Sequence, residues 1–128
     1  MKTIARHFVL FLSLLFIAVS CNNNDDDNNN TIGPQAVKYE VIGNFSGELD
    51  ATFNRNTDEG EAIKALPWTK EFITAQGTTG VTLIVDGIGG VAGQTLTLKI
   101  YVGGVVKKEF TATASSNGNI MGFRSYNF

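Results

Sequence analysis

Apolar and polar residues alternate along the chain from residue 36 onward, and a period of two is typical of half-buried β-strands. In the segment 36–42, Val37, Tyr39 and Val41 alternate with Lys38 and Glu40. The clearest segment is 95–102, whose expected inward positions are Leu96, Leu98, Ile100 and Val102. The pattern predicts seven strands in all, within 36–42, 45–53, 66–73, 81–85, 95–102, 105–114 and 120–128.

The residues between these segments predict how the strands are joined. Gly43-Asn44 separates the first two segments, which we therefore interpret as the two strands of an antiparallel hairpin. Gly103-Gly104 fits a two-residue hairpin turn, because both positions of such a turn need a positive φ. The returning strand places one set of alternating residues on a common face, namely Val106, Lys108, Phe110, Ala112 and Ala114.

No segment of ten or more residues in this region has helical periodicity, so the sequence predicts an all-β fold. Seven short strands at close intervals favour an antiparallel β-sandwich, Ig-like in general shape, with a small closed barrel as the alternative. The Cys-Trp-Cys spacing of antibody domains is absent. The length of the region 36–128 suits one domain.

The N-terminus has the parts of a secretory signal peptide, which we place at residues 1–20. Lys2 and Arg6 precede an apolar run over 8–19, which is shorter than the roughly 20 residues that span a bilayer as a helix. Ala18-Val19-Ser20-Cys21 resembles a bacterial lipobox, with cleavage between Ser20 and Cys21. Lipidation of Cys21, the chain's only cysteine, explains a thiol that has no disulfide partner within the chain. The alternatives are an ordinary signal peptide before an incidental cysteine, and a permanent transmembrane anchor.

Residues 21–35 are expected to form a disordered tether, because they are mostly Asn and Asp and can bury little apolar surface. Their acidic cluster resembles the signal that directs lipoproteins of Bacteroidetes-type bacteria to the cell surface. We therefore expect a cell-envelope protein, anchored in the outer membrane by acyl chains such as palmitate. Display at the surface and placement on the periplasmic face both remain open.

Charge and residue content narrow the function classes. Residues 36–128 carry eight Lys and Arg against nine Asp and Glu, with no basic block, so nucleic acid is not an expected partner. Cleavage would remove His7, the only histidine, and acylation would occupy Cys21. Catalysis by Ser-His-Asp or Cys-His groups then cannot operate, and neither can His or Cys metal sites. We expect no enzymatic activity, no cofactor and no metal.

Several segments have a chemical and a structural interpretation. Glu48 and Asp50 on one strand face could form a carboxylate pair, but we interpret them as solubilising surface residues. The acidic segment 54–61 could bind calcium, but it lacks EF-hand spacing, and a solvated hairpin turn is favoured. The Gly-rich segment 86–93 lacks the Lys-Ser/Thr of a phosphate loop, which favours a flexible connection.

The aromatic residues are the remaining candidates for binding. Trp68, the only tryptophan, follows Pro67 at an expected strand start. It could be a ligand platform, although a packing role is favoured. Tyr101 points outward from its strand and could be a platform for a ligand or a cross-strand packing residue.

Three segments together resemble the MmpS family, small mycobacterial membrane proteins that accompany RND-type exporters of lipids and siderophores. They are Val37-Lys38-Tyr39-Glu40-Val41, then Ala65-Leu66-Pro67-Trp68-Thr69-Lys70-Glu71-Phe72, and Leu96-Thr97-Leu98-Lys99-Ile100-Tyr101-Val102 with Val106-Lys107. The resemblance implies an extracytoplasmic β-sandwich and no catalytic motif. This chain differs by its lipobox and its Asn/Asp tether, where the family has an N-terminal helix.

These observations lead to a non-catalytic, lipid-anchored envelope protein as the expected function. A transport-accessory or scaffolding module that binds an envelope partner is the first hypothesis. The alternatives are a surface module that captures a glycan or lipid, and an adhesion module.

Overall fold

The computed structural model describes residues 31–54 and 59–128 and contains eight β-strands. The strands are β1 (Ala36–Gly43), β2 (Glu48–Asn54), β3 (Glu59–Ile63), β4 (Trp68–Ile73), β5 (Gly80–Ile88), β6 (Thr95–Val102), β7 (Val105–Thr113) and β8 (Ile120–Asn127). In this part of the chain, no helix is long and apolar enough to cross a membrane.

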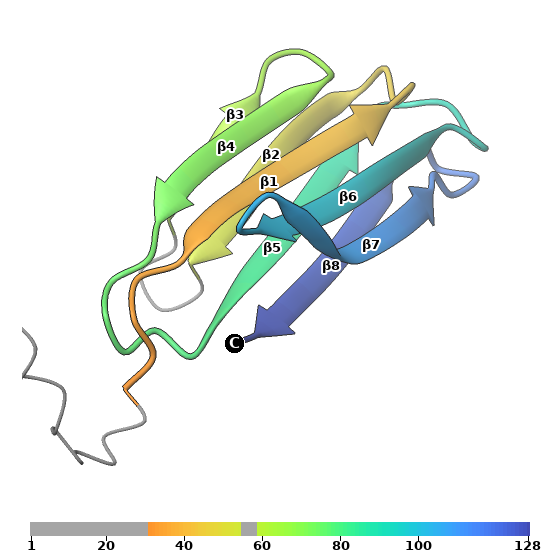
Figure 1. The fold of residues 1–128 in the computed structure, drawn as a ribbon. Coiled ribbons are helices and arrows are strands. Elements are labelled where there is room, and N and C mark those ends of the chain that lie inside the picture. The colour runs from red at the N-terminus through yellow and green to blue at the C-terminus, as the bar shows by residue number, and fades with distance from the viewer. Residues whose placement is uncertain (1–30, 55–58) are drawn as a thin grey trace, which may run out of the picture. The chain divides into compact units, whose positions relative to one another are not determined.

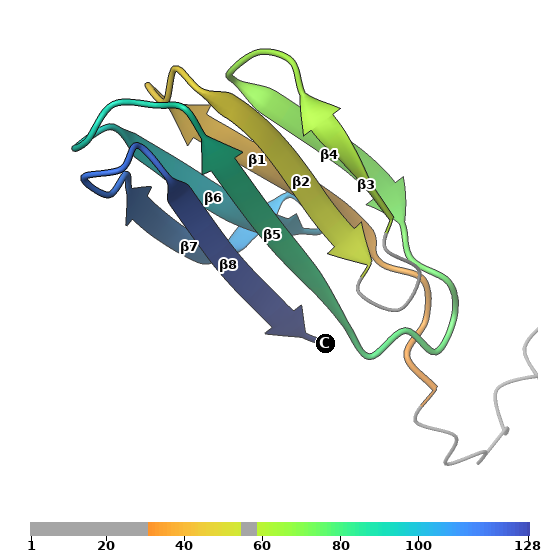
Figure 2. The same cartoon turned by 180° about the vertical axis from the view of Figure 1, so that it is seen from behind.

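The strands form two four-stranded sheets packed face to face, which confirms the predicted all-β sandwich. Sheet 1 has the order β4-β1-β6-β7 and faces the viewer in Figure 1. Sheet 2 has the order β3-β2-β5-β8 and is in front in Figure 2. Every pairing is antiparallel. Only β2–β3 and β6–β7 pair as hairpins, and the other consecutive strands lie in different sheets.

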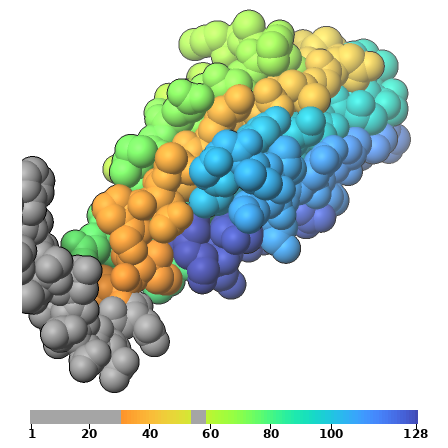
Figure 3. Space-filling model, viewed as in Figure 1, coloured from red at the N-terminus to blue at the C-terminus, as the bar shows by residue number. Residues whose placement is uncertain are grey.

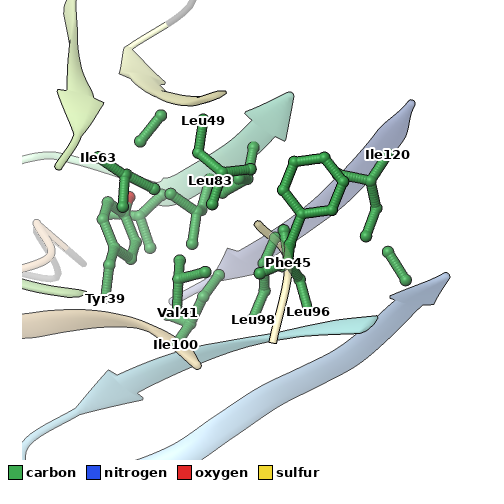
Figure 4. Close-up of a cluster of buried hydrophobic side chains, with 14 of the residues drawn as sticks. Tyr39, Val41, Phe45, Leu49, Ile63, Leu83, Leu96, Leu98, Ile100 and Ile120 are labelled. Carbon is green, nitrogen blue, oxygen red and sulfur yellow. The ribbon is translucent and has the colours of Figure 1, made fainter. Parts of the chain in front are cut away.

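The core lies between the sheets and is built from the alternate residues that the pattern predicted. Tyr39, Val41, Leu96, Leu98 and Ile100 on sheet 1 face Leu49, Leu83 and Ile120 on sheet 2, and Phe45 lies between them near one end (Figure 4). Each of these side chains is less than 9% exposed. Apolar burial of this kind is the main favourable term in folding, at ~25 cal/mol per Å² removed from water.

The predicted hairpin between the first two strands is wrong, because β1 and β2 belong to different sheets. Gly43 ends β1 with a φ of 144°, and a Cβ at this position would overlap the backbone of Thr95. Asn44 then donates its N–H to the carbonyl oxygen of Thr95 and accepts the N–H of Thr95 with its side-chain oxygen. After this turn Phe45 enters the core, and the chain continues into sheet 2.

Strand β3 is the element that the sequence analysis did not predict, so the structure has eight strands where seven were expected. Its residues are Glu-Gly-Glu-Ala-Ile, of which only Ile63 is buried. An edge strand needs few apolar residues, and this one therefore lacks a recognisable alternation. The hairpin that joins β2 to β3 agrees with the turn predicted within 54–61, although residues 55–58 lie outside the described residues.

The β6–β7 hairpin is confirmed, and Gly103 and Gly104 have φ values of 59° and 80°. The prediction that Val106 shares a face with Lys108, Phe110, Ala112 and Ala114 is wrong. Ile100 pairs with Lys108 while Tyr101 pairs with Val106, so Lys107 is an extra residue in β7. A bulge of one residue reverses the parity of the strand beyond it, and Val106 therefore lies on the outer face beside Tyr101.

The Gly-rich segment 86–93 is partly strand, since β5 continues to Ile88. The connection begins at Gly89 and is held by backbone hydrogen bonds from Gly90 to Gly118 and from Gly93 to Ala114. A connection is therefore present only in the second half of this segment, where these hydrogen bonds tie it to the loop that precedes β8.

Residues 31–35 run beside the loop that follows β4 (Figure 1). The carbonyl oxygens of Ile32 and Gln35 accept the backbone N–H groups of Gly77 and Thr74, and the Gln35 N–H donates to the Thr74 hydroxyl. The chain thus enters the sandwich at the end where β4 ends and β5 begins.

Candidate functional site

The proposed lipidation site falls outside the part of the chain that the structure describes. Ser20 and Cys21, where cleavage and acylation are predicted, precede residue 31. Asp58 of the acidic segment also lies outside the described residues, whereas Glu59 and Glu61 lie on β3. Among residues 31–54 and 59–128, no group of three or more His, Cys, Asp or Glu side chains is placed to share a metal ion.

Trp68 is half-buried against the core and also binds across the edge of the sandwich. Its indole N–H donates to Oε1 of Glu61 at 2.9 Å, and Nζ of Lys70 lies 3.2 Å from Oε2 of the same carboxylate. The hydrogen bond from Trp68, together with that from Lys70, lowers the pKa of Glu61 below its usual value. These contacts join edge strands β3 and β4 of the two sheets and favour the packing role for Trp68.

Arg124 bridges the opposite edge, between β7 and β8. Its Nε donates to the backbone carbonyl of Glu109 at 3.1 Å, and the guanidinium lies 4.5 Å from the ring centroid of Phe110. An unpaired edge strand can recruit another strand, and charged side chains at an edge oppose this. Both open edges of the sandwich therefore carry a cation that links the two sheets.

Tyr101 belongs to a network on the outer face of sheet 1, the side seen in Figure 3. Its hydroxyl donates to Oε1 of Glu40 at 2.9 Å, and the ammonium of Lys38 lies 4.7 Å from the ring centroid. Lys99 approaches the same carboxylate at 4.0 Å. The hydrogen bond to Glu40 raises the pKa of Tyr101. These contacts favour the cross-strand packing role over a ligand platform.

A pocket of about 740 Å³ opens at the end of the sandwich where the chain enters. Its aromatic wall consists of Tyr39, Phe53 and Phe72, with ring centroids 6.5 Å and 5.2 Å from that of Tyr39. Lys70 lies at the pocket and covers the ring of Phe53 at 4.8 Å. A volume of this size is within the range of small-molecule sites, roughly 300–1,000 Å³.

Two polar side chains of this pocket, those of Tyr39 and Lys70, are already engaged. The Tyr39 hydroxyl donates to the Thr82 carbonyl at 3.0 Å, and burial raises the pKa of this phenol well above its usual value. Tyr39 is therefore neutral at physiological pH, and the ammonium of Lys70 is paired with Glu61. Phe53 and Phe72 offer apolar surface at this pocket, beside the carboxylate of Glu59 and several threonine hydroxyls. Sequence reasoning missed it because Tyr39, Phe72 and Thr82 are far apart along the chain.

Glu48 and Asp50 lie on the outer face of β2, exposed as predicted. The structure adds a third carboxylate that the sequence did not associate with them, since Asp50 pairs directly with Asp86 of β5. Neither Asp50 nor Asp86 lines the pocket at the end where the chain enters.

The fold and these sites define a small β-sandwich whose two sheets are linked at both edges by Lys70 and Arg124. On the outer face of sheet 1, Glu40 is paired with Lys99 and Tyr101, and a pocket opens at the end where the chain enters. A family model described as "Mycobacterium membrane protein" matches residues 3–120. The chain belongs to this family of membrane-associated proteins, as the resemblance to MmpS proteins implied. A search of curated proteins finds no match to the chain.

Proposed function

We propose that the protein is a non-catalytic accessory module, held at the outer membrane by acyl chains on Cys21, whose β-sandwich binds a protein partner in the cell envelope. The observation that carries the proposal is the family match over residues 3–120. It includes the apolar N-terminal run as well as nearly the whole sandwich, and it supports membrane association of the chain. The lipobox-like sequence supplies the means of attachment.

The chemistry of the domain supports binding over catalysis. The buried phenol of Tyr39 stays protonated and donates to Thr82, and Lys70 is neutralised by Glu61. Groups engaged in this way position neighbouring strands, whereas a nucleophile or general base must be accessible and able to change its protonation state near neutral pH.

The anchor is tested with the full chain and its Cys21→Ala variant in cells fed an alkyne analogue of palmitate. We expect the wild-type chain to carry the label and to sediment with the outer membrane, and the variant to do neither. Protease added to intact cells then distinguishes the two faces of the membrane. Equal membrane association of an unlabelled Cys21→Ala chain would contradict lipid anchoring.

The partner is tested by affinity purification of the full chain from detergent-solubilised envelopes, with chemical cross-linking before lysis. We expect one integral envelope protein in stoichiometric amount. Recovery of the tagged chain alone, with and without cross-linking, would contradict the accessory role.

The pocket favours a second candidate function, capture of a lipid or glycan. The partly exposed rings of Phe53 and Phe72 at a pocket of about 740 Å³ can pack against an acyl chain or the apolar face of a sugar. The probe is a panel of fatty acids and oligosaccharides, read by melting temperature. Ala75→Phe narrows the pocket at an exposed position, and Ala92→Phe is the matched change elsewhere. A ligand that raises the melting temperature of the wild type and of Ala92→Phe, but not that of Ala75→Phe, supports this function. An unchanged melting temperature across the panel contradicts it.

A further inference from the structure

The outer face of sheet 2, which is turned toward the viewer in Figure 2, has an unusual composition. Its central residues form what we name the β2–β5–β8 face: Asp50, Ile84, Asp86, Ile88, Met121 and Phe123. The strand register places them side by side. Asp50 lies opposite Asp86, Asp86 opposite Met121, and Ile84 opposite Phe123. Directly opposed residues of this kind have Cβ atoms about 4.5–5.5 Å apart, so the face is contiguous.

Large apolar side chains are exposed on this face. Met121 is 67% exposed, Ile88 60% and Phe123 43%. Single exposed apolar residues are common, but a contiguous group of them on a protein surface often marks an interaction site. Burial of Leu83, Val85 and Ile120 on the inner face does not require apolar residues on the outer face. Polar residues at the outer positions would allow the same fold.

The carboxylates on this face lack the partners that those of sheet 1 have. Like charges directly opposite one another on a sheet are destabilising, and Asp50 and Asp86 form such a pair. Within the described residues, neither makes an ion pair or a side-chain hydrogen bond. On the outer face of sheet 1, Glu40 has both Lys99 and the Tyr101 hydroxyl. Glu40 on sheet 1 thus has a cation and a hydrogen-bond donor, whereas Asp50 and Asp86 have neither among the described residues.

We propose that the β2–β5–β8 face docks a protein surface that presents Lys or Arg side chains within an apolar contact area. A cation placed between Asp50 and Asp86 relieves their repulsion, and the apolar rim of Met121 and Phe123 removes the contact from water. Charge and apolar complementarity together are what a specific interface needs. This inference rests on the proposed accessory function and names the surface that serves it.

Other occupants fit this face less well. A second copy of the chain docked through the same face would bring the carboxylates of one face against those of the other. An anionic membrane surface would be repelled in the same way. Addition of a strand at an edge is opposed by the bridges of Lys70 with Glu61 and of Arg124 with Glu109.

The test uses the full chain in its own envelope, with the photo-reactive residue p-benzoylphenylalanine in place of Met121 or, as a control, of Thr111. Thr111 is exposed on the outer face of sheet 1. We expect irradiation to join the Met121 position to one envelope protein and the Thr111 position to none. A carbodiimide, which couples carboxylates directly to lysines, should then join Asp50 or Asp86 to a lysine of the same protein, identified by mass spectrometry.

Charge variants decide whether the carboxylates take part. Asp50→Asn with Asp86→Asn keeps the shape of the face and should lower the yield of the Met121 adduct at least tenfold, while the melting temperature stays equal or rises because the repulsion is removed. Glu71→Gln, an exposed change on sheet 1, should leave the yield unchanged. An undiminished adduct in the double variant would overturn the proposal.

The remaining outcomes separate the two proposals. A protein adduct from the Thr111 position alone would overturn the assignment of the face and leave the accessory function standing. Adducts only with a second copy of the chain, or only with lipid, would also overturn it. An absence of protein adducts from both positions, with no partner in the affinity purification, would overturn the accessory function itself.

Discussion

The phenol of Tyr39 on β1 donates a hydrogen bond of 3.0 Å to the carbonyl oxygen of Thr82 on β5, and this bond joins the two sheets across the core. Tyr39 has no exposed surface, and its ring contacts those of Phe53 and Phe72. A buried hydroxyl that lacks a partner is costly, so the bond to Thr82 makes a tyrosine acceptable in this position. The same residue lies behind the rings of Phe53 and Phe72 at the pocket and supports them from the core.

Replacement of Tyr39 by Phe should therefore destabilise the domain although it retains the ring. We expect a loss of about 1–2 kcal/mol, because the Thr82 carbonyl loses a buried donor. The measurement is the midpoint of urea unfolding at neutral pH. Tyr101→Phe is the matched control, since its hydroxyl bonds to Glu40 at the surface, and it should shift the urea midpoint clearly less. Equal effects of the two changes would contradict this account.

The pKa of Tyr39 predicts how stability changes at high pH. Burial raises this pKa in the folded state, whereas in the unfolded chain it is near the usual value of about 10. Above that pH the unfolded state releases a proton that the folded state keeps, so the free energy of unfolding falls as pH rises. Urea midpoints from about pH 8 to about pH 11 should fall more steeply for the wild type than for Tyr39→Phe. Parallel curves would show that other groups cause the decline.

The bond between Trp68 and Glu61 predicts a change at acid pH. Since the hydrogen bond from Trp68 lowers the pKa of Glu61, the interaction is fully present above the usual carboxyl range and is lost as pH falls through the lowered value. Trp68 is the only tryptophan, so its fluorescence should report this step with a midpoint below 4.5. The step should vanish in Glu61→Gln and persist in Glu71→Gln. Because the carboxylate is at the surface, the effect on stability should be below about 1 kcal/mol.

Much of the sandwich could be predicted from the sequence because its strands bury one face each. Leu83 and Val85 on β5, like Leu98 and Ile100 on β6, are fully buried where alternation placed them. A period of two is a local property, and it indicates which residues point inward without reference to the rest of the fold. The positions of the core residues therefore followed from local pattern alone.

The partners of each strand could not be predicted in the same way. The turn after Gly43 differs from a hairpin only through its contact with Thr95, which is distant in the sequence. The bulge at Lys107 moves Val106 to the outer face without any local signal in composition. The pocket around Tyr39 and the opposition of Asp50 and Asp86 depend on pairings of this kind, and they became visible only in the structure.

Gly89 and Gly90, adjacent in the connection after β5, should respond differently to replacement by alanine. Gly89 has a φ of 75° and open space around a Cβ, so Gly89→Ala should cost about 1–2 kcal/mol of backbone strain. A Cβ on Gly90 would overlap the buried ring of Phe45, and such overpacking should cost about 2–3 kcal/mol. Urea unfolding measures both losses.

The two mechanisms are separated by adding Phe45→Leu, which makes room at the ring. This second change should recover part of the stability lost in Gly90→Ala and none of that lost in Gly89→Ala, because only residues that share a contact have coupled effects. If Phe45→Leu changes the stability of Gly90→Ala by the same amount as it changes that of the wild type, the contact between Gly90 and Phe45 is not the reason for a glycine at this position.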